Sequence, residues 1–163
     1  DERQMIEYTQ SSGNEIGAIL RVSDGTRVGE PMVGDANSLR IPRIIDSESY
    51  VVTHTHPSSA SFSAEDVYAL VDNSGLKAMR VVGADGTRYT LVKPEDFDLP
   101  REFGTLGQIR EQWLYERDQS TKRYQHMVNK GFMPYEEAWQ TQSHAIMMKL
   151  AEKMGLEYVK VAP

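Results

Sequence analysis

The sequence of 163 residues contains no cysteine. This absence excludes disulfide-linked scaffolds, zinc sites built from thiolates, and cysteine nucleophiles. A bound metal ion would therefore have to use histidine, aspartate or glutamate side chains. Histidine is also scarce, because the sequence has only four, and two of them, His54 and His56, stand two residues apart. This pair is the first candidate for a metal site.

The sequence also lacks a long apolar run and a surplus of basic residues. No apolar stretch approaches the roughly 18–20 residues of a membrane span, and no signal peptide is visible. We therefore expect a cytoplasmic protein that does not bind membranes. The first residue is Asp1 rather than Met, which is consistent with a fragment of a longer chain. The 18 basic and 24 acidic residues give a net charge of −6, which argues against nucleic-acid binding.

The chain has the length of one domain with a substantial core, but its first hundred residues differ in pattern from its last sixty. In the first part, short β-branched runs and Asp-Gly turn signals predict β-hairpins, and in the second part helical spacing dominates. The pattern predicts strands over 14–22, 27–33, 50–54, 76–83, 87–93 and 156–161. It predicts helices that open at Ser63, extend over 105–129, and run from Pro134, as the first helical residue, to a stop at Gly155.

The informative segment runs from His54 to Asp66. Histidines at i and i+2 near a strand end point to the same face, so their imidazoles can share one metal ion. Asp66 follows ten residues after His56, in the expected first helical turn, from which its carboxylate can reach back. Two histidines, one carboxylate and a water make an open catalytic zinc site.

Each part of this segment also has a simpler interpretation. An isolated His-x-His pair on a strand is usually a surface pair without a ligand. Ser63 and Asp66 have the spacing of a helix capping box, with Ser63 as the N-cap residue. Only the combination of these parts, with a separate glutamate at Glu15, favours a catalytic site.

This combination resembles the JAMM zinc metalloproteases, also called the JAB or MPN domain. Glu15–Gly17 matches the family's early E-x-G, His54–Pro57 matches H-[ST]-H-P, and Ser63–Asp66 matches S-x-x-D. Six residues separate His56 from Ser63, one fewer than is usual in the family. The resemblance covers roughly residues 10–93 and leaves residues 101–163 unassigned.

The resemblance implies a role for each matching residue. His54, His56 and Asp66 would bind Zn²⁺. Glu15 would be the general acid and base, which takes a proton from the attacking water and passes it to the leaving amine. Ser63 would help to stabilise the oxyanion.

The resemblance also implies a fold and a function. The expected fold is α/β, a mixed and curved sheet flanked by helices, with a metalloprotease domain over 1–100 and a helical C-terminal extension over 101–163. Residues 34–49 and the loop 57–62 should flank the cleft. The expected function is zinc-dependent hydrolysis of a peptide or isopeptide bond, with a protein or peptide substrate such as the C-terminal tail of a ubiquitin-like protein.

Three alternatives remain open at this point. The domain could be a catalytically idle scaffold, a relative of DNA-associated family members, or an interaction module whose helices bind a partner. The complete motif argues against the first alternative, and the acidic charge balance argues against the second. The sequence does not indicate an oligomeric state.

Several other residues have a structural interpretation. His126 and His144 are expected to be surface or partly buried side chains in helices, and Trp113 and Trp139 to belong to the core or an interface. Thr55 should point to the face opposite its histidine neighbours, where it packs or makes a local hydrogen bond.

Overall fold

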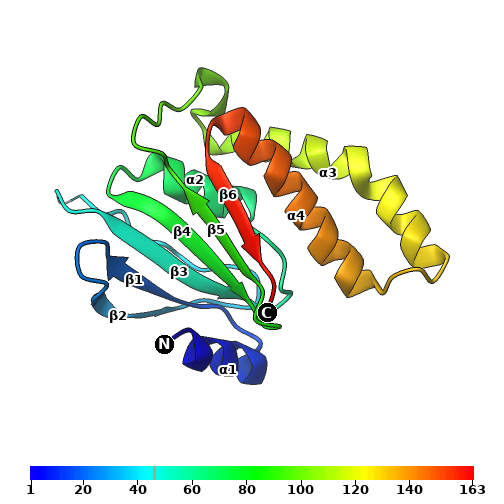
Figure 1. Ribbon diagram of the computed structural model, residues 1–163, viewed down its shortest axis with the longest axis horizontal. Helices are drawn as coiled ribbons and strands as arrows, with labels where there is room; N and C mark the ends of the chain where they lie inside the picture. Colours follow the sequence, from blue (N-terminus) through cyan, green and yellow to red (C-terminus); the bar gives the residue numbers. More distant parts are fainter. Residues whose placement is uncertain (46) are drawn as a thin grey trace.

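The computed structural model describes residues 1–45 and 47–163, and Asp46, which belongs to the expected cleft segment 34–49, lies outside the described residues. A six-stranded sheet in the order β2-β1-β3-β4-β5-β6 forms the centre of the molecule (Figure 1). The elements, in chain order, are α1 (Glu2–Ser12), β1 (Ile16–Arg21), β2 (Arg27–Val33), β3 (Tyr50–His56), α2 (Ala64–Asp72), β4 (Leu76–Gly83), β5 (Arg88–Val92), the 3₁₀ helix η1 (Arg101–Phe103), α3 (Leu106–Asn129), α4 (Tyr135–Met154) and β6 (Glu157–Val161).

The sheet is mixed, because β3 and β4 pair in parallel while every other neighbouring pair is antiparallel. A parallel pair needs a crossover connection, and α2 provides it between β3 and β4. The prediction of a mixed α/β sheet flanked by helices is confirmed. No helix among the described residues is both long and apolar enough to span a membrane.

Both predicted Asp-Gly hairpins are present. Gly25 between β1 and β2, and Gly86 between β4 and β5, have φ of 71° and 88°, which an L side chain adopts only with strain. In each turn the preceding aspartate accepts a hydrogen bond from the backbone N–H two residues on, 2.9 Å in the first turn and 2.8 Å in the second. These turns join β1 to β2 and β4 to β5, and β3, which carries the histidines, lies between β1 and β4 in the sheet.

Helix α1 was not among the sequence expectations. Its signals are local and weak: Asp1 caps its N-terminus, Gly13 ends it in the left-handed conformation, and only Met5 and Thr9 are buried. Ion pairs of Glu2 with two arginines of the sheet help to hold the helix in place. A helix with so few buried positions lacks the apolar stripe by which helices are recognised in sequence.

Residues 101–163 complete both the sheet and the core. Strand β6 pairs antiparallel with β5, which confirms the predicted closing strand. Met147, Leu150 and Met154 of α4 belong to the same buried cluster as Phe62 and Leu91. The segments on either side of residue 100 therefore share one sheet and one hydrophobic core.

The two long predicted helices correspond to α3 and α4, which form a hairpin whose turn extends away from the sheet (Figure 1). The prediction that Pro134 is the first helical residue is wrong by one position. Pro134 is the N-cap, with an extended ψ of 156°, and the helix begins at Tyr135. Gly155 ends α4 in the left-handed conformation, as predicted.

Candidate metal centre

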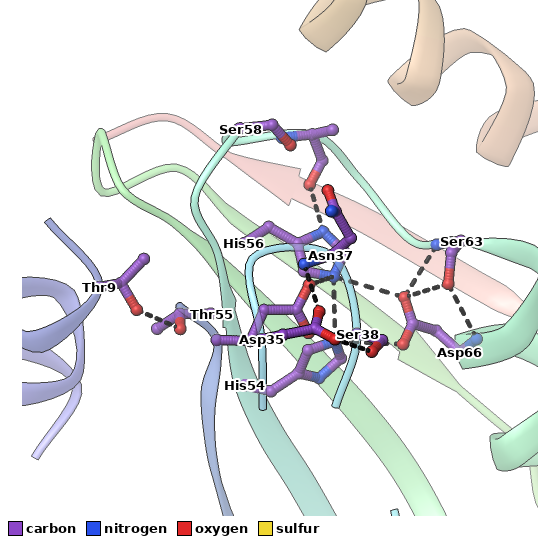
Figure 2. Close-up of polar contacts among 12 residues, drawn as sticks. Thr9, Asp35, Asn37, Ser38, His54, Thr55, His56, Ser58, Ser63 and Asp66 are labelled. Carbon is purple, nitrogen blue, oxygen red and sulfur yellow. Dashed lines mark hydrogen bonds and ion pairs between the residues drawn. The ribbon is translucent and has the colours of Figure 1, made fainter. Parts of the chain in front are cut away.

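The C-terminal end of β3 carries the two histidines on one face of the sheet. His54 is fully buried and His56 is 8% exposed, and both rings point toward Asp66 (Figure 2). Thr55 between them points to the other face, where its hydroxyl contacts Thr9 of α1 and accepts a hydrogen bond from Ile16 N at 3.0 Å. The prediction that Thr55 lies on the opposite face is confirmed.

Glu15 reaches the same place from the segment before β1. Its backbone N–H donates to Asp35 O at 2.8 Å, and its carbonyl accepts from Gly34 N at 3.0 Å. Gly17, two residues later, is the register partner of His54. A Cβ atom on Gly17 would lie 2.5 Å from Leu39 Cδ2 and 3.1 Å from His54 Cβ. The glycine of the E-x-G motif thus permits the close approach of β1 to the histidine strand.

Asp66 is held by a capping box at the start of α2. The Ser63 backbone N–H and hydroxyl both donate to Asp66 Oδ2 at 2.8 Å, and Asp66 N donates to Ser63 Oγ at 3.1 Å. The capping interpretation of this motif is confirmed. These contacts also fix the carboxylate against the histidines, so capping and site assembly are achieved by the same atoms (Figure 2).

The distances between the donor atoms of His54, His56 and Asp66 are close to those between the ligands of a single metal ion. The two Nε2 atoms lie 3.1 Å apart, His54 Nε2 lies 3.2 Å from Asp66 Oδ1, and His56 Nε2 lies 3.4 Å from Asp66 Oδ2. Tetrahedral zinc with bonds of 2.0–2.2 Å separates its ligand atoms by about 3.3–3.6 Å. The same spacing permits hydrogen bonds when a proton stands in place of the ion. The residues therefore fit a metal ion.

Either Glu15 or Asp66 could provide the third metal ligand beside the two histidines. Donor atoms of Glu15, His54 and His56 all lie within 4.8 Å of one another, so this buried group could bind a metal ion. Asp66 is not part of that group, yet its oxygens make the shorter contacts with the histidines, whereas Glu15 Oε1 lies 3.9 Å from His56 Nε2. The Asp66 carboxylate therefore lies closer to His56 than the Glu15 carboxylate does.

The outer nitrogens of the two rings differ. His56 Nδ1 lies 3.0 Å from Ala60 O and can only donate to that carbonyl, which leaves the Nε2 lone pair for a metal. His54 Nδ1 is buried and has no partner among the described residues. An unsatisfied N–H there costs about 1–3 kcal/mol, against the roughly 10–16 kcal/mol found for structural zinc sites. The free energy of zinc binding is therefore large enough to outweigh the cost of this unsatisfied N–H group.

Burial and close charges perturb the metal-free site. Burial raises the pKa of Glu15 to about 7, with the charge of His56 opposing and that of Asp66 adding to the effect. Burial alone would lower the pKa of His56, but its hydrogen bond to Asp66 and the two carboxylate charges raise it. Burial disfavours the ionised Asp66, yet both histidines hold its pKa well below the ordinary value. The two carboxylates are thus differentiated, one as an anion and one as a group that exchanges protons near neutral pH.

A cleft of about 580 Å³ opens onto Glu15, His56 and Asp66. Residues 36–39 and 57–62, but for Ser59, line it, which confirms the predicted flanking segments in part. Trp113 of α3 and Trp139 of α4 also line it, with ring centroids 6.2 Å apart.

Sequence reasoning assigned these two tryptophans to the core or an interface and missed their place in the cleft. Their helical spacing carries no sign of it, because only the packing of α3 against α2 and of α4 against β6 brings the rings to the site. A second cleft of about 580 Å³ lies between α3 and α4 and shares Trp139. None of the motif residues line that second cleft, so the chemistry favours the first.

The other two histidines behave as expected. His126 is exposed on α3. His144 is partly buried on α4, where its Nδ1 lies 2.9 Å from the Tyr158 hydroxyl. Burial and the charge of Lys160 lower the pKa of His144.

The structure brings all five motif residues to one place: Glu15, His54, His56, Ser63 and Asp66. The oxyanion role of Ser63 stays a prediction, since its hydroxyl donates to Asp66 here. No family model, curated protein or solved structure matches this chain.

Proposed function

We propose that this protein is a zinc-dependent peptidase or isopeptidase of the JAMM type. The observation that carries the proposal is the convergence of His54, His56 and Asp66 at 3.1–3.4 Å, with a buried carboxylate, Glu15, at its edge and an open cleft in front. Structural zinc sites usually have four protein ligands, whereas three ligands and an open position are typical of catalytic ones.

The choice of zinc follows from the donor set. Two imidazole nitrogens and one carboxylate oxygen suit a borderline ion such as Zn²⁺ better than Mg²⁺ or Ca²⁺, which prefer all-oxygen sites. When bound, the ion would supply Lewis acidity and lower the pKa of a water molecule to about 7. His54, His56 and Asp66 would hold it.

Glu15 would carry the proton. Its carboxylate lies beside the histidines, is 5% exposed, and faces the cleft. A pKa near 7 matches a group that accepts a proton from the attacking water and returns it to the leaving amine. The charge of a bound ion would lower this pKa and favour the ionised, proton-accepting form.

Ser63 would have two tasks. Its backbone N–H and hydroxyl orient Asp66, and the proposed oxyanion role requires the hydroxyl to turn from Asp66 Oδ2 toward the substrate. The backbone N–H still holds the carboxylate after such a rotation. Both tasks are therefore compatible with one serine.

The substrate would be a short extended segment of a protein or peptide, for example the C-terminal tail of a ubiquitin-like protein. The cleft volume of about 580 Å³ lies in the usual range for small-ligand sites and is far too small for a folded domain. Its walls combine serine hydroxyls with the aromatic faces of Trp113 and Trp139. Such walls suit a backbone with a few apolar side chains.

The test is a paired measurement of metal content and turnover. Wild-type protein should hold one zinc per chain and cleave a ubiquitin-like fusion or a member of a peptide library, as detected by mass spectrometry. Glu15→Gln should keep the zinc and lose roughly 10²–10⁴ in rate. The exposed Glu7→Gln variant is the matched control and should behave as wild type. Zinc without cleavage of any substrate would favour a catalytically idle scaffold, and absence of zinc would contradict the proposal.

A further inference from the structure

One peptide unit in the loop after β3 is hydrogen-bonded at both ends. The carbonyl of Ala60 accepts from His56 Nδ1 at 3.0 Å, and the N–H of Ser61 donates to Ser143 Oγ at 2.9 Å. These two groups belong to the same Ala60–Ser61 peptide bond. Ser143 lies in α4, 82 residues away in sequence, and all four residues are buried.

The geometry of a peptide bond links the two contacts. The Ala60–Ser61 bond is trans, because no peptide bond of the described residues is cis, so its C=O and N–H point in opposite directions in one plane. Anchoring the N–H on Ser143 therefore sets the direction of the carbonyl, which is toward the His56 ring. Each bond also polarises the peptide in the sense that strengthens the other.

Ser143 is prepared to act as the acceptor. Its hydroxyl proton is donated to Gln140 O at 2.9 Å within α4, which leaves the oxygen lone pairs for Ser61 N–H. The serine is 1% exposed, so water does not compete for these lone pairs. The direction of this hydrogen bond is thus set by the helix.

The rest of the loop is anchored on the same side. The Ser61 hydroxyl lies 2.8 Å from the Tyr158 hydroxyl of β6. Ser59 has a φ of 55°, and its carbonyl accepts from the Tyr89 hydroxyl at 3.0 Å. Ala60 therefore lies between two fixed neighbours, and its peptide plane has little freedom to rotate.

We propose that Ser143 is a positioning residue for the metal centre, which holds His56 in its Nδ1–H tautomer through the Ala60–Ser61 peptide. This tautomer keeps the Nε2 lone pair directed at the ion. The inference rests on the metal-binding role of His56 in the proposed function. It assigns part of the C-terminal segment, through α4, to the assembly of the site. Outer contacts of this kind are worth about 10–100-fold in metal affinity.

The experiment reads the tautomer and the zinc affinity separately. Long-range ¹H–¹⁵N spectra of the zinc-loaded protein report which nitrogen of His56 carries the proton and which one binds the ion. Competition with a zinc chelator gives the affinity. We expect the Nδ1–H tautomer in wild type, and in Ser143→Ala a mixed tautomer with zinc binding 10–100-fold weaker. Ser143→Thr, which keeps a hydroxyl, should restore both readouts.

The matched control is Thr141→Ala, which removes another α4 hydroxyl, one that donates to the Glu137 carbonyl of its own helix at 2.8 Å. It should leave tautomer and affinity unchanged. If Ser143→Ala does not fold, Ser143→Cys retains the volume with a much weaker acceptor and should show the same changes.

Two results would overturn the inference. One is a zinc-loaded wild-type protein in which Nδ1 of His56 binds the ion and Nε2 carries the proton, which needs no variant. The other is a Ser143→Ala or Ser143→Cys protein with a lowered melting temperature but unchanged tautomer and zinc affinity, which would make the contact merely structural. Neither readout requires a substrate, so a protein without peptidase activity that shows the expected changes would refute only the catalytic proposal.

Discussion

Replacement of Glu15 by glutamine should stabilise the metal-free protein at alkaline pH, although it abolishes the proposed proton transfer. Burial raises the pKa of Glu15 from 4.5 to about 7. Between these pH values the folded protein retains a proton that the unfolded chain has released. The stability of the metal-free protein therefore falls as the pH rises through this window. Glutamine does not titrate, so the stability of the variant does not fall in this pH window for this reason.

The size of the effect follows from the pKa difference. At about 1.36 kcal/mol per pKa unit, the rise from 4.5 to about 7 corresponds to roughly 3 kcal/mol above pH 7. One edge of Glu15 faces the open cleft, where solvent screening weakens the effect, so we expect about 2 kcal/mol. For a chain of 163 residues this gain corresponds to a rise in melting temperature of about 4–8 °C.

The assay is urea or thermal unfolding of chelator-treated wild type and Glu15→Gln at pH 5 and pH 8. The other titrating groups of the site are common to both proteins, and the pKa of His56 is expected to fall in the variant, because the Glu15 charge helps to raise it. Glu7→Gln, on the exposed face of α1, controls for the loss of one negative charge. A Glu15→Gln protein whose stability relative to wild type is the same at both pH values would refute the reasoning about burial.

The other predictions concern the ligands, the serine, the cleft wall and the C-terminal segment. The double variant His54→Ala, His56→Ala should bind no zinc by elemental analysis, because one remaining ligand cannot hold the ion; a full equivalent would make the site assignment wrong. Ser63→Ala should lose about 10²–10³ in turnover and about 1 kcal/mol of stability with zinc retained; equal turnover at a lowered melting temperature would leave only the cap. Trp139→Ala should raise KM for a peptide substrate more than it lowers kcat, because the ring lines the cleft and is not one of the motif residues; an unchanged KM would argue against contact with substrate. Truncation after Pro100 removes β6 and part of the core and should give an aggregating or unfolded product by circular dichroism and light scattering; a stable monomer would contradict the shared core.

Local features of the sequence were sufficient for most of the secondary structure. The Asp-Gly turns at Gly25 and Gly86 have backbone conformations that glycine favours, and Gly155 ends α4 for the same reason. Ser63 and Asp66 form the capping box that their spacing predicted. Helix α1 was missed because only two of its residues are buried, so that its spacing contains little periodic information.

The candidate site could be predicted in part because its residues form a recognisable pattern. His54 and His56 share a face through the alternation of a strand, and Asp66 follows in the next helical turn. Glu15 stands about forty residues earlier, and only the pairing of β1 with β3 brings it to the histidines. Its assignment therefore depended on the resemblance to a family and not on local spacing.

Contacts between near neighbours are therefore enough to predict the elements other than α1 and η1, the turns and the ligand pattern around His54 and Asp66. The place of Trp139 in the cleft and the hydrogen bond from Ser143 to the peptide bonded to His56 depend instead on long-range packing. The contact between Ser61 and Ser143 spans 82 residues, and a single serine in a helix has no distinguishing local signal. Such contacts arise when β6 pairs with β5, α4 packs against β6 and α3 packs against α2 and α4, and the position of each hydroxyl follows from that packing.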